Sequence, residues 1–394
     1  MTDPPTIVKV SNHIPDDFKF SILSKLPIKS LVRFRCVRKS WSLLFKNLYF
    51  MNMYRNNFIS NNNFSYVDHS CLTLDLEEPI YELRDALYSR SGERFENKVK
   101  LDWPPPFHED DQGIRLLGYT AANDTLCLYQ GFKIPKVVFW NLTTKEFKVL
   151  PSSPLEFTPP SYETVFISIH GFGYDPISDD HKVIRHAAHI LSFTDSEGCY
   201  FPPHDSLWEV YSLRSNSWRK LDVDMPTGYL TSGSRVYKNG VCHWWDEREA
   251  CLVSFDLSRD VFFRTSLPLY VDDDYDFDLV DRRFMVLNGS VACISTYETS
   301  NVNTPTAFNV SLLGELGVKE SWTKLFVYGP LPCIDHPIGA GNKGDIFFRS
   351  KEDELVRFDM STQMIEKLGI KHVLYIEILL YKEVLLPIGG QKNV

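Results

Sequence analysis

Hydrophobic and polar residues follow a helical period near the N-terminus and a strand-like period through most of the remaining chain. Phe18, Ile22 and Leu26 recur every fourth residue, which predicts a helix with one apolar face. Pro15 stands at the expected start of this helix, where a missing N–H is tolerated. Pro27 is expected to end it, because proline cannot donate the next helical hydrogen bond.

Two further short helices follow from the same pattern. Their apolar positions are Leu31, Phe34 and Val37 for one and Trp41, Leu44 and Phe45 for the other. A helical unit this small buries little surface, yet it has more large apolar side chains than its core can hide. An exposed apolar patch on such a unit usually indicates a protein partner. The alternative is a helical hairpin that packs only on the rest of this chain.

From residue 114 onward the chain consists of short apolar runs separated by turn signals. These signals are Asn123-Asp124, Asp179-Asp180, Asn239-Gly240, Asn288-Gly289 and Lys343-Gly344. Pairs of this kind between alternating runs predict β-hairpins. They recur about every 50 to 60 residues, and a period near 50 is typical of kelch-like propeller blades.

A second hairpin recurs between those turns. Its five copies span residues 137–151, 208–221, 252–268, 308–326 and 355–370. Each copy is too small to bury its own faces, which favours radial stacking into a β-propeller over a pair of β-sandwiches. Strands within 372–388 are expected to pair with strands from 71–88 and so close the ring, which hides the sheet edges.

The helical segment resembles the F-box, in particular its plant form. The resemblance is carried by Ile14-Pro15, Ile22-Leu23-x-x-Leu26-Pro27, Lys29-Ser30-Leu31-x-x-Phe34 and Cys36-Val37-x-Lys39-Ser40-Trp41. It implies that the segment binds the Skp-family adaptor of cullin-based ubiquitin ligases. The residues assigned to that contact are Pro15, Ile22, Leu23, Leu26, Pro27, Leu31, Val37 and Trp41.

Most of residues 114–385 resembles the F-box-associated domain of plant F-box proteins. The resemblance is carried by Gly171-Phe172-Gly173-Tyr174-Asp175-Pro176, Asp180-x-Lys182-Val183, Val210-Tyr211-Ser212-Leu213, Ser217-Trp218 and Gly240-x-x-x-His243-Trp244. Members of this group include relatives of the pollen S-locus F-box proteins. The expected fold is multidomain, a three-helix F-box before a kelch-like β-propeller of about six blades. The expected parts are a flexible N-terminus (1–11), the F-box (12–55), a linker (56–70) and the propeller-like domain (71–390).

Charge divides the chain in the same place. Residues 1–55 hold ten Lys or Arg and three Asp or Glu, a net charge of +7, whereas the remainder holds 32 and 48, a net charge of −16. Basic helices can bind nucleic acid, but no recognition helix is visible. An acidic adaptor is the favoured partner of the basic face.

The composition is that of a globular protein, 43% hydrophobic and 24% charged. No secretory signal is recognisable, and the apolar stretch near the C-terminus is interrupted by charges, so we expect no membrane association. Eight scattered cysteines without a C-x-x-C pair are expected to be reduced thiols in the cytoplasm or nucleus.

Three groups of residues are candidates for metal binding or catalysis. Cys242, His243 and Cys251 could suggest zinc but lack a fourth ligand. Residues 272–278 place Asp at alternate positions as calcium loops do, without the glycine and final acid of such loops. His181, His186 and His189 have no nucleophile paired with them in the sequence. We therefore expect no catalytic residues, metal or cofactor.

The function expected from these features is substrate recognition in an SCF-type E3 ubiquitin ligase. The F-box would bind the adaptor, and the cullin through it, while propeller loops would hold a target protein. The candidate loops are 103–113, 151–164, 192–206, 270–281 and 298–306. Alternatives are an adaptor-binding interaction protein outside a ligase, a propeller-scaffold enzyme and, less favoured, a DNA-binding protein.

Overall fold

The structure is a computed structural model of the 394-residue chain. It describes residues 16–26, 28–34, 41, 43, 47–60, 71–77, 84–109, 111–131, 135–153, 163–191, 206–223, 225, 235–267, 280–297, 306–331, 334–341, 344–371 and 378–380.

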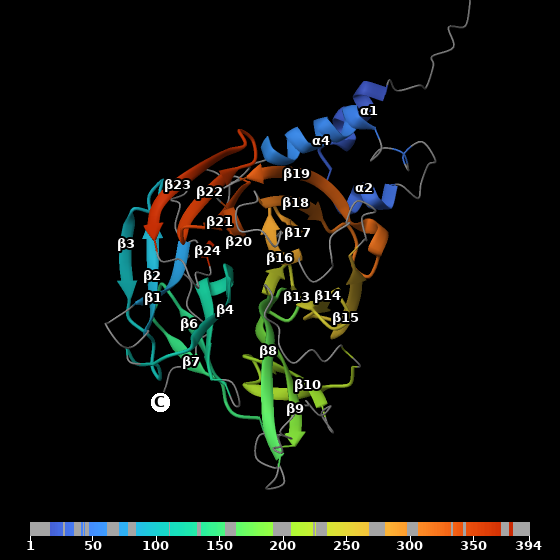
Figure 1. Ribbon diagram of the computed structural model, residues 1–394. Helices are drawn as coiled ribbons and strands as arrows, with labels where there is room; N and C mark the ends of the chain where they lie inside the picture. Colours follow the sequence, from blue (N-terminus) through green and yellow to red (C-terminus); the bar gives the residue numbers. More distant parts are fainter. Residues whose placement is uncertain are drawn as a thin grey trace, which may run out of the picture.

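The described strands form six four-stranded antiparallel sheets arranged around a common centre, which is a six-bladed β-propeller (Figure 1). Each sheet buries its faces against the neighbouring sheets, as where Leu117, Phe172 and Tyr211 share one hydrophobic cluster between two blades. Neighbouring blades thus bury the apolar side chains that a single hairpin would leave exposed. The predicted fold class is confirmed, and six separate sheets exclude the pair of β-sandwiches.

The blades are numbered by their order along the chain. Blade 1 contains β24 (Ile378–Leu380), β1 (Cys71–Glu77), β2 (Arg84–Ser91) and β3 (Asn97–Leu101). Blade 2 contains β4 (Ile114–Thr120), β5 (Thr125–Gln130), β6 (Lys136–Asn141) and β7 (Phe147–Val149). Blade 3 contains β8 (Glu163–Asp175), β9 (Asp180–Leu191), β10 (Ser206–Ser212) and β11 (Ser217–Leu221). Blade 4 contains β12 (Arg235–Lys238), β13 (Val241–Asp246), β14 (Cys251–Asp256) and β15 (Val261–Ser266). Blade 5 contains β16 (Val280–Leu287), β17 (Ser290–Tyr297), β18 (Thr306–Leu312) and β19 (Thr323–Leu331). Blade 6 contains β20 (Ile334–Ala340), β21 (Asp345–Ser350), β22 (Glu354–Asp359) and β23 (Met364–Lys371).

The ring is closed by strands from the two ends of the propeller sequence. β24 pairs with β1, so that Cys71 lies opposite Leu380 and Thr73 opposite Ile378. Blade 1 therefore takes its innermost strand from the C-terminal segment and its other three from residues 71–101. The predicted pairing of 372–388 with 71–88 is confirmed for the described strand, residues 378–380.

Both repeats seen in the sequence correspond to repeated parts of the blades. The turn signals connect the first and second strands of blades 2 to 6, and Asn239, Gly240, Asn288 and Gly289 have the positive φ angles that such tight turns require. The five copies of the second hairpin are the third and fourth strands of the same blades.

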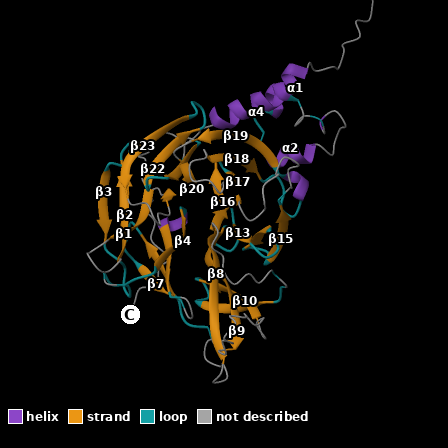
Figure 2. Ribbon diagram, viewed as in Figure 1, coloured by secondary structure: helices purple, strands orange, loops and turns teal. Residues whose placement is uncertain are grey.

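Three described helices precede the propeller and lie together on one side of the ring (Figure 2). They are α1 (Asp16–Leu23), α2 (Ile28–Phe34) and α4 (Leu48–Ser60). Asn47 caps α4, because its Oδ1 accepts a hydrogen bond from the Phe50 N–H at 3.0 Å. The helix continues through residues 56–60, which belong to the segment expected to be a linker.

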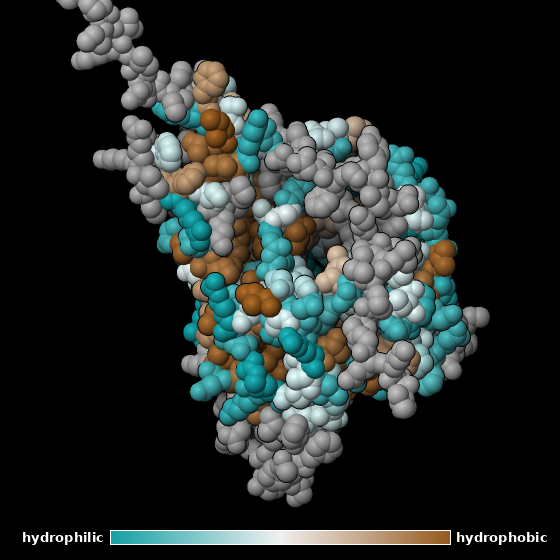
Figure 3. Space-filling view, turned by 180° about the vertical axis from the view of Figure 1, so that it is seen from behind, coloured by the Kyte–Doolittle hydropathy of each residue, from teal (hydrophilic) through white to brown (hydrophobic). Residues whose placement is uncertain are grey.

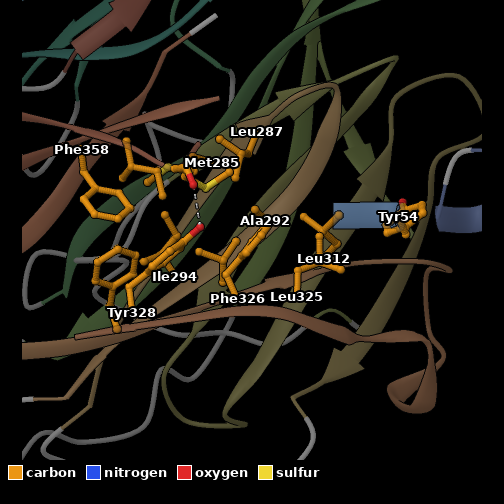
Figure 4. Packing of buried hydrophobic residues seen from close by; sticks show 14 of the residues in the cluster. Tyr54, Met285, Leu287, Ala292, Ile294, Leu312, Leu325, Phe326, Tyr328 and Phe358 are labelled. Atoms are coloured by element: carbon orange, nitrogen blue, oxygen red, sulfur yellow. Dashed lines mark hydrogen bonds between the residues drawn. The ribbon is translucent and has the colours of Figure 1, made fainter. Parts of the chain in front are cut away.

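One hydrophobic cluster joins these helices to blades 5 and 6. It includes Phe50, Met51 and Tyr54 of α4 together with Leu312 and Leu325 of blade 5. Figure 4 shows Tyr54 at the end of the cluster nearest Leu312 and Leu325. Burial raises the pKa of the Tyr54 hydroxyl, as expected for a phenol inside such a cluster. The helical unit therefore shares a core with the propeller.

Candidate functional site

The described helices carry an exposed apolar surface. Its members, which we call the helical patch, are Phe18 and Ile22 of α1, Leu43, and Leu48 and Tyr49 of α4. Phe18 is 66% exposed and Ile22 60% exposed. The rings of Phe20 and Tyr49 lie 6.3 Å apart, which brings α1 and α4 side by side. Figure 3 shows hydrophobic surface gathered over this part of the molecule.

The spacing of α1 explains why apolar residues remain outside. Phe20 and Leu23 point into the cluster shared with the propeller, whereas Phe18 and Ile22 are four residues apart and lie on the opposite side. A single short helix cannot turn all four toward one core. Large apolar side chains left exposed in this way mark a protein interaction surface.

The residues that the sequence analysis assigned to the adaptor contact differ in their exposure. Ile22 is exposed, whereas Leu23 and Leu31 are buried among side chains of this chain. Leu26 and Trp41 are partly buried and pack against the same cluster. Three assigned residues, Pro15, Pro27 and Val37, lie outside the described residues.

Four exposed residues of the helical patch were not in the assigned set: Phe18, Leu43, Leu48 and Tyr49. A signal for Phe18 was present, because it belongs to the same four-residue repeat as Ile22. Leu48 and Tyr49 follow the recognised motif, and their pattern did not show which face α4 would turn outward.

Two polar contacts fix the helical unit further. Arg33 of α2 lies 3.6 Å from the Glu315 carboxylate, in the segment between β18 and β19. The Asn57 side-chain amide of α4 donates to the Ser24 hydroxyl at 2.7 Å. The first pair is exposed and adds little stability, but it places α2 beside the turn of blade 5.

The antiparallel order of the strands gives the ring two distinct ends. At one end of the ring, which we call the turn end, a tight turn connects the innermost strand of each of blades 2 to 6 to the second strand of that blade. At the opposite end, which we call the loop end, the innermost strands of these blades begin; they are β4, β8, β12, β16 and β20. All five loops expected to hold a target leave the ring at the loop end, because each either precedes an innermost strand or connects a second strand to a third. Large parts of these loops lie outside the described residues.

The motif of residues 171–176 has a structural role at the turn end. A Cβ on Gly171 would lie 2.7 Å from the Cβ of Cys242, and one on Gly173 would overlap the Tyr237 ring. Glycine is therefore needed where β8 packs against blade 4. The motif defines how blades 3 and 4 approach each other.

The Asp175 carboxylate links the same two blades. It accepts hydrogen bonds from Lys182 Nζ at 2.7 Å and from the Ser258 hydroxyl of blade 4, while Lys182 also donates to the Leu257 carbonyl oxygen at 2.7 Å. Burial by itself would raise the pKa of Asp175, but these hydrogen bonds outweigh it and lower the pKa well below its ordinary value. The group is structural.

The candidate zinc residues do not converge. Cys242 and His243 are neighbours on β13, so their side chains point to opposite faces of the sheet. His243 Nδ1 lies 2.8 Å from the Ser254 hydroxyl, and burial lowers the pKa of His243 to about 3. This Ser–His pair is buried and closed to a substrate. Within the described part of the chain, no three His, Cys, Asp or Glu residues are grouped to hold a metal ion.

The remaining candidates are equally dispersed. His181 Nε2 lies 3.0 Å from the Thr120 hydroxyl, and His186 packs on the Trp208 ring with centroids 5.0 Å apart. The two histidines occupy opposite faces of β9, since they are five positions apart along the strand. The side chain of His189 and the calcium-like segment 272–278 lie outside the described residues. Among the helices described, none has the length and apolar character needed to span a bilayer.

Comparison with protein families identifies both parts of the chain. Residues 93–376 match the model of the F-box associated beta propeller domain, and residues 12–52 match the F-box domain.

Three similar proteins come from Arabidopsis thaliana. F-box protein CPR1 is 25% identical over 384 residues, covering 91% of this chain and 84% of that protein. F-box only protein 8 is 27% identical, covering 69% of this chain and 85% of that protein. An F-box/kelch-repeat protein is 24% identical, covering 83% of this chain and 82% of that protein. The relation to S-locus proteins stays a prediction.

Proposed function

Because this chain belongs to the family of F-box proteins with an F-box associated β-propeller domain, we propose that it is the substrate-recognition subunit of an SCF-type E3 ubiquitin ligase. The F-box binds a Skp-family adaptor and, through it, the cullin. The propeller binds a target protein. The observation that carries this proposal is the helical patch, which remains exposed although the same helices share a core with the propeller.

The adaptor contact is centred on Phe18 and Ile22 and extends over Leu48 and Tyr49. Aromatic and branched apolar side chains of this kind supply much of the free energy of association when a partner covers them. Leu26 and Trp41 contribute at the margin, where they are still partly accessible. Leu23 and Leu31 act by holding the helices in place. The basic residues of this segment suit an acidic adaptor.

Binding both partners on one chain is enough to promote ubiquitination. A tethered target meets the charged ubiquitin-conjugating enzyme at a high effective concentration, so attack by a target lysine becomes nearly unimolecular. This role requires no catalytic residue, metal or cofactor from this chain. It suits a protein of the cytoplasm or nucleus, where cullin ligases would meet their targets.

The experiment that tests this function is co-purification with the adaptor. Replacing both exposed residues of α1, Phe18→Asp with Ile22→Asp, removes apolar contact area and adds charge, so we expect loss of the adaptor from the purified complex. Ile177→Asp is the matched control, because Ile177 is 80% exposed on a turn of blade 3. The melting temperature of all variants should stay near that of the wild type.

Retention of the adaptor by the folded double variant would contradict the assigned surface. Adaptor binding without recovery of any cullin would favour an interaction protein outside a ligase. Binding of duplex DNA by the full chain that weakens steeply with salt would favour the nucleic-acid alternative.

A further inference from the structure

Arginines gather at the loop end of the central channel, although the propeller as a whole is acidic. Arg115 lies near the start of β4, Arg235 begins β12, and Arg282 and Arg283 lie near the start of β16. All four are half-buried. Arg283 pairs with the Asp281 carboxylate at 3.1 Å. The charge of Arg115 acts on the Asp85 carboxylate, whose pKa burial nevertheless raises. Arg115 and Arg235 are singled out because they share one neighbour, Tyr129.

One tyrosine connects these two arginines. The Arg235 Nη1 donates to the Tyr129 hydroxyl at 3.3 Å, and its guanidinium lies 5.7 Å from the centroid of the Tyr129 ring. Tyr129 is also the cross-strand neighbour of Arg115 in the β4–β5 pair, a position in which side chains lie close together. Two cations and a phenol thus meet where blades 2 and 4 approach each other across the channel.

Buried polar atoms without partners lie directly behind Arg235. Trp244 is its cross-strand neighbour, and the His170 ring lies 5.2 Å from Trp244 and 4.6 Å from Trp208. Among the described residues, neither ring nitrogen of His170 has a hydrogen-bond partner, and neither does the indole Nε1 of Trp208 or Trp244. All three side chains are more than nine-tenths buried. Buried polar groups are normally satisfied, so donors left open beside a guanidinium favour a ligand that accepts hydrogen bonds.

Burial also fixes the charge state of this group. It lowers the pKa of His170 well below the ordinary value, with smaller contributions from His186 and Arg235. His170 is consequently neutral near pH 7 and offers a single N–H. Within the described part of the chain, the positive charge of the site comes from the arginines.

The surroundings limit what can reach this site. The described loops of the loop end hold eight carboxylates and two cations. The carboxylates are Asp102, Glu109, Asp111, Asp222, Glu247, Glu249, Glu352 and Asp353, and the cations are Arg248 and Lys351. An acidic rim repels an extended polyanion such as a nucleic acid, whereas a single acidic side chain can pass it and meet the arginines.

We propose that Arg115, Tyr129 and Arg235 form an anion-binding site that receives an acidic side chain, bearing a carboxylate or a phosphate, from a peptide segment of the target protein. This inference rests on the proposed function, because it names the chemistry of the target that the propeller holds. Guanidinium groups suit both anions, since their N–H donors match the paired oxygens.

The test is fluorescence anisotropy of the full-length protein with short labelled peptides. One probe carries a single central Glu in an otherwise neutral sequence, a second carries phosphoserine in that place, and a third carries Gln there. We expect at least one acidic probe to bind more tightly than the Gln probe. The two acidic probes distinguish carboxylate from phosphate recognition.

Two substitutions should weaken that binding. Arg115→Gln with Arg235→Gln removes charge-assisted hydrogen bonds and should lower the affinity at least about tenfold. Arg219→Gln is the matched control, because Arg219 is an exposed arginine of β11 paired with Asp260. Tyr129→Phe keeps the ring and removes only the hydroxyl, so it gives a second, milder variant should the arginine variant fail to fold.

Equal affinity of the wild type and both site variants would overturn the proposal, as would absence of binding to either acidic probe. Binding of duplex DNA in place of the peptides would also overturn it. Adaptor binding is measured on the same samples. If the adaptor binds and the peptides do not, this inference fails while the proposed function stands; if the peptides bind and the adaptor does not, the reverse holds.

Discussion

At the scale of single residues, the buried histidines make the stability of the propeller depend on pH. His186 packs on Trp208, and burial lowers its pKa to about 4. His243 is buried beside Ser254 with a pKa near 3. Both are neutral in the folded state, whereas the unfolded chain takes up a proton near the ordinary histidine pKa of about 6.5.

We predict that the free energy of unfolding falls as the pH is lowered from about 6.5 toward 4. The folded pKa values are depressed, so the stabilisation is present above the unfolded pKa and is lost as pH falls. Each such histidine contributes a slope of about 1.4 kcal/mol per pH unit in this window. Urea unfolding between pH 7.5 and 5 measures it.

A pair of variants separates this effect from general acid unfolding. His186→Phe should reduce the slope, because the ring between Trp208 and His170 no longer takes up a proton when the chain unfolds. His108→Gln removes a histidine from an exposed position and is the matched control. An unaltered slope in the His186 variant would show that its burial does not control the pH dependence.

Residue roles in the helical unit were only partly predictable. The repeat of Phe18, Ile22 and Leu26 indicated one apolar face, but it could not show that Leu23 and Leu31 turn toward the propeller while Phe18 stays outside. The burying partners, such as Leu312 and Leu325, come from residues about 290 positions later in the chain. Local periodicity contains no information about such distant contacts.

At the scale of elements, a strand of only three residues closes the ring. β24 supplies the innermost strand of blade 1, and Ile378 packs in a cluster with Cys71 and Phe347 from the two blades that it joins. The backbone of Gly339 in blade 6 also approaches Ile378 closely, where a Cβ would lie 3.2 Å away. β24 therefore connects blades 1 and 6.

Truncation after Lys371 should lower the melting temperature by about 5 °C or more, because it removes the ladder to β1 and the buried Ile378 side chain. Truncation after residue 383 is the control, since it keeps β24 and removes most of the remaining C-terminal segment. Differential scanning calorimetry compares the two. The same melting temperature for both would mean that the closing strand adds no stability.

Elements were more predictable than the contacts between them. Turn pairs such as Asn-Gly, together with alternating runs, identified the hairpins of blades 2 to 6, because turn chemistry and period are local. Blade 1 was harder to recognise, since its strands come from both ends of the propeller sequence. The role of Gly173 was likewise hidden until Tyr237 of the next blade was seen against it.

At the scale of the whole molecule, the two proposed binding surfaces lie at different ends of the ring. The helical unit is joined to blade 5 through Leu312, Leu325 and the Arg33–Glu315 pair, all at the turn end. The proposed anion site at Arg115 and Arg235 lies at the loop end. A target held there is kept apart from the adaptor, so both can bind at once.

The most direct measurement is affinity purification of the full-length protein from plant cells under proteasome inhibition, in parallel with the Phe18→Asp, Ile22→Asp variant. We predict that the wild type recovers the adaptor, a cullin and at least one ubiquitin-modified target, and that the variant recovers the target without adaptor or cullin. Recovery of adaptor and cullin by the folded variant at the level of the wild type, or their absence from both samples, would contradict the account.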